Sequence, residues 1–171
     1  MLIDCGVLLG TKDADRLMTD VARDIRQATG DHLDALVVTH EHWDHVSGFL
    51  QAKEHFAKIS VDQVWLAWTE NPKNPLAREL RERRQAALQG LRIVLQNAAA
   101  APPLFARRIE SLMRFYGPDL GATGKATTED ALDWVKQKWG HHRYCDPGGA
   151  PLQIEGLSDV RFYVLGPPAD A

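Results

Sequence analysis

The chain has 171 residues, of which 44% are hydrophobic and 25% are charged. That balance is typical of a folded globular domain and excludes a disordered tail or a fibrous repeat. The 20 basic and 23 acidic residues give a net charge of −3, which does not indicate binding to nucleic acid or to a membrane surface. We expect one domain, with a core large enough to fold without disulfides.

The sequence carries no sign of a membrane segment or a secretory signal. No apolar stretch reaches the roughly 18 residues that a membrane helix needs. The first ten residues include Asp4 and lack a basic start, so they are typical of a strand. Cys5 and Cys145 lie far apart without a CxxC pair, which predicts two reduced thiols. The expected location is therefore cytoplasmic, with no membrane partner.

The first part of the chain alternates between strand and helix patterns. Apolar residues at three- and four-residue intervals predict a helix that ends at Gly30, and a continuous apolar run predicts a strand buried on both faces. The expected elements are a strand over residues 1–5, a helix over 13–29, a strand over 33–39, a helix over 47–58 and a strand over 61–68.

The second part of the chain is mostly helical in pattern. Asn74 and Pro75 form a helix cap and first-turn pair, and Thr128 precedes two acidic residues as a cap would. The expected elements are a helix from Pro75 to the double proline at 102–103, a helix over 105–116, a glycine-rich connector over 117–126, a helix over 128–140 and strands over 152–155 and 160–165. The fold class is therefore α/β, with a helical insertion over about residues 75–140 between sheet segments.

Residues 40–45 read HEHWDH and follow the predicted buried strand directly. Alternate residues of an extended segment point the same way, so His40 and His42 can bind one cation from one side. Asp44 and His45 follow on the turn, where they can hold a second cation roughly 3.5 to 4 Å away, with a bridging water activated for attack. The alternative, a polar loop with incidental histidines, does not account for so dense a cluster. The pattern indicates a metal-dependent hydrolase.

The motif His40-x-His42-x-Asp44-His45 after an apolar strand resembles the signature of the metallo-β-lactamase superfamily of metal-dependent hydrolases. Residues 2–6 resemble the strand and turn before the first helix of that family, and residues 160–168 resemble a strand of members related to DNA-uptake proteins. The resemblance implies an αββα sandwich, here its first half with a helical insertion. It also implies two zinc ions, the first on His40 and His42 and the second on Asp44 and His45, with Asp44 orienting the nucleophilic water.

The family completes its site with a later His, a bridging Asp and usually a last His, which are not evident in this sequence. We therefore expect residues 1–171 to form a single truncated domain that is a poor catalyst alone. His141 and His142 are the nearest substitutes for the missing ligands, although a histidine pair after a helix end is more often solvated. Asp4 is expected to accept turn hydrogen bonds, with support of the histidine loop as the alternative.

The expected function is hydrolysis of an ester, amide, thioester or phosphodiester bond, in a small-molecule or phosphodiester substrate, at a dinuclear zinc-type site. Manganese or iron also suits His and Asp ligands. One alternative is a non-catalytic module with a vestigial or single-metal site. A second is nucleic-acid binding, because residues 71–116 hold nine basic and three acidic residues, a net charge of +6. A solvated helix face explains those charges more simply.

Overall fold

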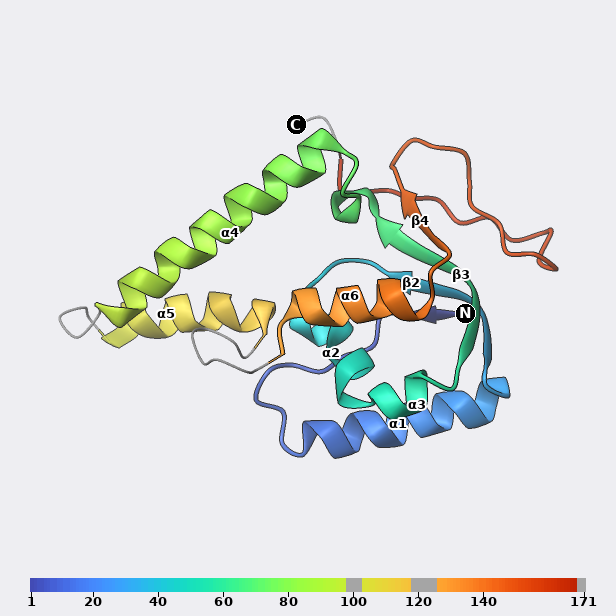
Figure 1. Ribbon diagram of the computed structural model, residues 1–171, viewed down its shortest axis with the longest axis horizontal. Helices are drawn as coiled ribbons and strands as arrows, with labels where there is room; N and C mark the ends of the chain where they lie inside the picture. The colour runs from blue at the N-terminus through green and yellow to red at the C-terminus, as the bar shows by residue number, and fades with distance from the viewer. Residues whose placement is uncertain (98–102, 118–125, 169–171) are drawn as a thin grey trace.

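The computed structural model describes residues 1–97, 103–117 and 126–168 of the chain. Within these ranges one parallel sheet has its strands in the order of the chain, β1-β2-β3-β4 (Figure 1). The strands are β1 (Leu2–Ile3), β2 (His32–Val38), β3 (Ser60–Ala67) and β4 (His142–Cys145). The helices are α1 (Ala14–Thr29), α2 (Trp43–Gln51), α3 (Lys53–Phe56), η1 (Trp68–Glu70), α4 (Pro75–Gln96), α5 (Pro103–Met113), η3 (Arg114–Tyr116) and α6 (Thr128–Lys138).

Helices cover one face of the sheet. Connections between neighbouring parallel strands are right-handed, so strands that follow one another across the sheet send their connections over the same face. The main core lies between this face and helices α1, α2, α3 and α6, and its side chains are almost fully buried. Its most deeply buried side chains include Leu36, Val38, Val46, Phe49, Phe56, Val64, Leu66, Leu132 and Val135.

The opposite face of the sheet is covered by an extended segment after β4. Leu152 and Phe162 exchange two backbone hydrogen bonds, of 2.8 and 2.9 Å, and both pack near Trp65 of β3. The indole of Trp68 donates to the carbonyl of Pro167 at 2.6 Å. The cover is thin near its end, where Leu165 is 90% exposed. An apolar groove lies beside this segment on the sheet face.

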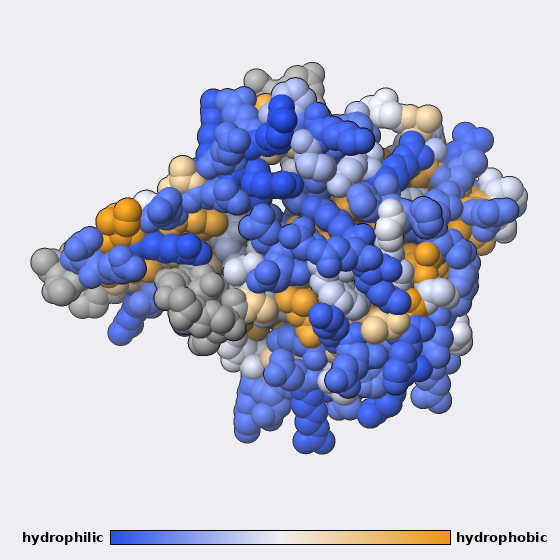
Figure 2. Space-filling model, in the orientation of Figure 1, coloured by the Kyte–Doolittle hydropathy of each residue, from blue (hydrophilic) through white to orange (hydrophobic). Residues whose placement is uncertain are grey.

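Helices α4 and α5 form a hairpin that stands out from the body of the molecule (Figure 1). The first half of α4 contacts the body, because Ala77 is buried there and Arg81 and Arg84 form ion pairs with Glu70 and Glu41. Apolar side chains such as Ile93 and Phe105 are exposed on the hairpin, where Figure 2 shows orange patches. Helix α6 differs from them, because it packs on α2 and belongs to the layer that covers the sheet.

The predicted α/β alternation and the positions of α1, β2, β3 and α4 are confirmed, whereas several boundaries were wrong. The predicted helix over 47–58 begins earlier, at Trp43, and is divided into α2 and α3. The cap of α6 is Thr127, which forms a reciprocal capping box with Asp130, and Thr128 is the first helical residue. Strand β4 was not predicted. The connector over 117–126 lies largely outside the described residues.

The strands predicted over 1–5, 152–155 and 160–165 are also shorter than expected. Strand β1 has two residues, because Asp4 turns the chain with a left-handed φ of 53°. The two C-terminal segments share a single bridge, since turns at Leu157 and Val160 take up the residues between them. None of the helices in the described ranges combines the length and the apolar character needed to cross a bilayer.

Candidate metal centre

Three chain segments meet at the carboxyl edge of the sheet. They are the turn after β1, the loop after β2 and the first turn of α2. The backbone N–H of Cys5 donates to the carbonyl of His45 at 2.7 Å, and Gly48 N–H donates to the carbonyl of Cys5 at 3.0 Å. Glycine is needed for this approach, because a Cβ on Gly6 would lie 2.6 Å from the carbonyl oxygen of Asp44. The turn after β1 is therefore held against the start of α2.

His40 and His42 converge at the start of this loop. Nε2 of His40 lies 3.1 Å from Nδ1 of His42, and the two rings are arranged edge to face. Nitrogens that share one tetrahedral zinc ion lie about 3.3 Å apart, because each is about 2.05 Å from the metal. The separation of the two histidine nitrogens therefore fits a shared cation.

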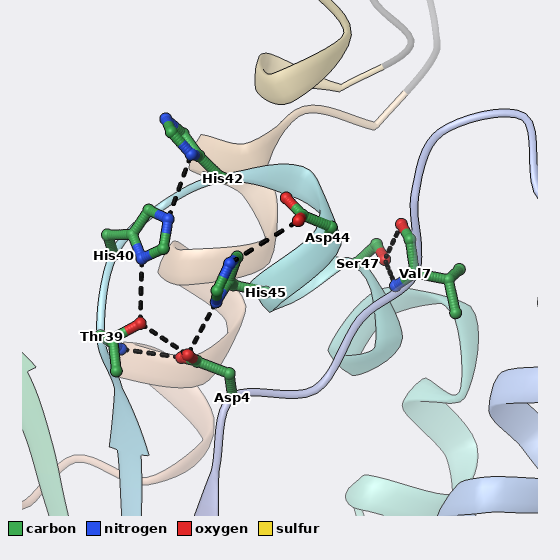
Figure 3. Close-up of polar contacts among 8 residues, drawn as sticks. All are labelled: Asp4, Val7, Thr39, His40, His42, Asp44, His45 and Ser47. Atoms are coloured by element: carbon green, nitrogen blue, oxygen red, sulfur yellow. Dashed lines mark hydrogen bonds and ion pairs between the residues drawn. The ribbon is translucent and has the colours of Figure 1, made fainter.

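Asp4 determines which nitrogens of two histidines carry hydrogen (Figure 3). Its Oδ2 lies 2.8 Å from Nδ1 of His45 and 2.5 Å from the hydroxyl of Thr39, and that hydroxyl lies 2.9 Å from Nδ1 of His40. A carboxylate can only accept, so His45 Nδ1–H donates to Asp4, and so does the Thr39 hydroxyl. The hydroxyl oxygen then accepts from His40 Nδ1–H. Both Nε2 atoms are left with a free lone pair for a metal.

Asp44 lies in the first turn of α2, where its negative charge is favoured by the helix dipole. Its Oδ2 is 3.6 Å from Nε2 of His45. Its Oδ1 is buried and has no hydrogen-bond partner among the residues that the structure describes. A buried carboxylate oxygen without a partner is costly unless a cation or another donor satisfies it. The donor set of imidazole nitrogens and carboxylate oxygens suits zinc, manganese or iron, so the residues present fit a bound divalent metal.

Burial also keeps two of the imidazoles neutral. Burial lowers the pKa of His40, and the neighbouring His45 lowers it further. The pKa of His42 is lowered first by burial and then by His40. Glu41 lies between them in sequence, and burial raises the pKa of its carboxyl group to about 7 against the opposing effect of Arg84. Neutral imidazoles are the form that binds metal, so the two histidines are ready to act as ligands.

The structure brings His40, His42, Asp44 and His45 together through the contacts of His40 with His42 and His45 and of His45 with Asp44, while their use as metal ligands stays a prediction. It also brings in Asp4, which forms a group with His40 and His45 whose ligand atoms all lie within 4.8 Å of one another. Of the two expectations for Asp4, its contact with His45 agrees with the alternative, support of the histidine loop. No signal within the motif indicates its role, because the contact joins residues 41 positions apart.

The other histidines do not join this cluster. His142 lies in β4 and its Nε2 is 3.1 Å from the hydroxyl of Tyr144, while His141 is exposed. Neither contacts the loop after β2 in the described residues, so the structure gives no support to their use as ligands. His32 forms a second group with Asp34 and Asp62, all exposed, at the amino end of the sheet. This group lies at the opposite end of β2 from His40.

Comparison with known proteins agrees with this geometry. The family model described as the metallo-beta-lactamase superfamily matches residues 1–160. The chain therefore belongs to the metallo-beta-lactamase superfamily. Its fold is that of metal-dependent hydrolases, and members of the superfamily typically bind divalent metal ions. No curated protein and no solved structure matches the chain.

Proposed function

We propose that the chain is a hydrolase that binds two divalent ions, zinc first among them, through the loop over residues 40–45. His40 and His42 would hold the first ion, and Asp44 and His45 the second. The observation that carries the proposal is the arrangement of donors without other partners: paired nitrogens 3.1 Å apart on His40 and His42, and a buried Asp44 oxygen that accepts no hydrogen bond from the described residues.

The side chains of the loop would share the chemical work. A bound divalent ion lowers the pKa of a water molecule and so supplies a nucleophile at neutral pH. Asp44 offers a carboxylate beside His45 that can orient this water and accept its proton. Asp4 and Thr39 keep His45 and His40 in the tautomer that binds metal. Phe115 and Tyr116 of η3 lie beside His42, with ring centroids 5.2 and 5.4 Å away, and can contact an apolar part of a substrate.

The substrate that we propose is a small molecule or a phosphodiester with an ester, amide, thioester or phosphodiester bond. The structure gives less support to nucleic-acid binding through the arginines of α4. Arg84 is paired with Glu41 and Arg81 with Glu70, so these two charges face carboxylates of the protein. Arg83 is exposed and pairs with Glu79 on the surface of the helix, as expected for a solvated face.

Metal titration of the full chain tests the proposal. Zinc or cobalt should bind at the loop over residues 40–45, and the double variant His40→Ala, His42→Ala should lose that binding. His32→Ala is the matched control, because it removes a ligand from the exposed second group and should leave binding at the loop unchanged. Turnover of phosphodiester, ester, thioester and β-lactam test substrates should be low in this chain, and Asp44→Asn should abolish it. Metal binding that survives unchanged in the double variant would contradict the assignment, and loss of binding in His32→Ala would place the metal at the exposed second group instead.

A further inference from the structure

Glu41 contacts the α4 hairpin rather than the histidine cluster. It lies between His40 and His42, yet its Oε1 is 2.7 Å from Nε of Arg84 and its Oε2 is 2.8 Å from Nη2 of the same guanidinium. Two parallel hydrogen bonds of this kind fix both the distance and the orientation of the pair. The Glu41 side chain is only 12% exposed, so little water screens the contact.

A second ion pair joins the same face of α4 to the end of the neighbouring strand. Arg81 precedes Arg84 by three positions, so the two side chains lie on one side of the helix. Nη2 of Arg81 is 3.4 Å from Oε2 of Glu70, which follows β3 and is 3% exposed. Lys136 of α6 approaches the same oxygen at 3.7 Å. Helix α4 therefore bridges the segments that leave β2 and β3.

Glu41 connects helix α4 to the candidate metal ligands through the backbone of the loop. The peptide units on either side of Glu41 lead to His40 and His42, so a displacement of Glu41 moves the backbone of both ligands. The body of the protein restrains the other part of the loop through Asp4, Cys5 and His45. His42 is held at the start of α2, where its carbonyl accepts from the N–H groups of His45 and Val46 at 2.9 and 3.2 Å. The contact from α4 adds a restraint at Glu41, between the two histidines.

We propose that Arg84 is a positioning residue for the metal centre, which fixes the separation of His40 and His42 through its paired hydrogen bonds to Glu41. The inference rests on the proposed function, because it assigns Arg84 a part in binding the same metal. Among the described residues Arg84 makes its hydrogen bonds to Glu41 and none to the candidate ligands, so it would act on them through Glu41. Its removal should alter the affinity and the coordination geometry of the metal while the sheet and its helical layer stay folded.

Cobalt titration followed by visible absorption tests the inference, because the spectrum reports coordination geometry independently of turnover. Arg84→Met should lower cobalt affinity roughly tenfold, as loss of a contact that orients a ligand does, and should change the absorption bands. Arg84→Lys keeps the charge but not the paired geometry and should recover part of the affinity. Arg83→Met is the matched control, because Arg83 is a neighbour on α4 whose side chain is 74% exposed.

A further variant separates positioning from folding. Arg84→Met leaves a buried carboxylate without its partner, whereas Glu41→Met with Arg84→Met removes both charges and should restore the metal-free stability. We expect this double variant to be folded by circular dichroism and still to bind cobalt more weakly than the unaltered chain. Unaltered affinity and spectrum in a folded Arg84→Met or double variant would overturn the inference alone. Absence of cobalt binding in the unaltered chain would instead overturn the proposed function, and the inference with it.

Discussion

The carboxylate of Asp4 lies 2.8 Å from Nδ1 of His45, although the two residues are 41 positions apart in the chain. This contact ties the turn after β1 to the first turn of α2. The same carboxylate accepts from the backbone N–H of Thr39 at 2.8 Å and so also holds the end of β2. One side chain therefore connects all three segments that supply the candidate ligands.

Asp4→Asn should weaken metal binding about 10- to 100-fold without unfolding the chain. The amide keeps the shape of the side chain and tolerates the left-handed φ of 53°, but it loses the charge that accepts from His45 and Thr39. Isothermal titration with zinc measures the change. Asp13→Asn is the matched control, because Asp13 also has a φ of 53° and makes no side-chain cap at the start of α1. Equal losses in both variants would contradict a specific role for Asp4.

Gly6→Ala should destabilise the chain by about 1–3 kcal/mol, because the added Cβ would lie 2.6 Å from a backbone oxygen that cannot rotate away. The strain should push the turn after β1 away from α2 and weaken metal binding as well. Gly90→Ala offers the contrast. Gly90 lies within α4 with open space around it, so alanine there should stabilise the chain by about 0.5–1 kcal/mol. Chemical denaturation of the metal-free chains measures both changes.

Asp31→Asn should destabilise the chain at neutral pH and have no effect in strong acid. The hydrogen bonds from Arg26, at 2.5 and 2.9 Å, lower the pKa of the Asp31 carboxyl below its ordinary value of 3.8. A carboxyl group with a lowered pKa in the folded state stabilises the fold above its unfolded pKa, and this contribution is lost as the pH falls through the folded pKa. Asparagine also accepts the left-handed φ of 63° at this position. The unfolding curves of the variant and the unaltered chain should therefore differ at pH 7 and coincide at pH 2.

Both cysteines should resist alkylation in the folded chain. Burial raises the pKa of Cys5 to about 12, with a smaller contribution from Asp4, and burial also raises the pKa of Cys145. Because the thiolate is the reactive form, Cys5 should react about a thousandfold more slowly at pH 8 than a thiol with the ordinary pKa of 9.0. Iodoacetamide labelling followed by mass spectrometry checks this, with the Cys145→Ser variant isolating Cys5. Rapid labelling of Cys5 without denaturant would contradict the prediction, because it would show that reagent reaches the thiol in the segment after β1.

The sequence was informative where one local pattern decides the structure. Strand β2 is a continuous apolar run, and Gly30 ends α1 with a φ of 62°, so periodicity and glycine chemistry predict both elements. Residues 40–45 predict the metal chemistry because all four candidate ligands lie within six positions. The residue types alone are sufficient to predict the chemistry of this loop, because strand β2 fixes where the loop begins and which way it leaves the sheet.

Features that depend on tertiary pairing could not be read from the sequence. Strand β4 reads HRYC, which has no apolar alternation, and it forms because its backbone pairs with β3 from Val64 to Ala67. Trp43, Asp44 and His45 were expected in a turn, yet they begin α2, where Trp43 is buried under η3 and Gly117. The contacts of Asp4 with His45 and of Glu41 with Arg84 join residues more than forty positions apart, so no window of sequence contains them.

The four strands lie in the sheet in the order in which they follow one another in the chain, and this order affects how the protein folds during synthesis. Strands β1, β2 and β3 and all the candidate ligands lie in the first part of the chain, so this part can fold as it leaves the ribosome. Strand β4 pairs with β3 only after helices α4, α5 and α6 have been made, and a pairing so distant in sequence closes slowly. During that interval the free edge of β3 is exposed, and it is there that we expect a nascent chain to be most open to chaperones or to mispairing.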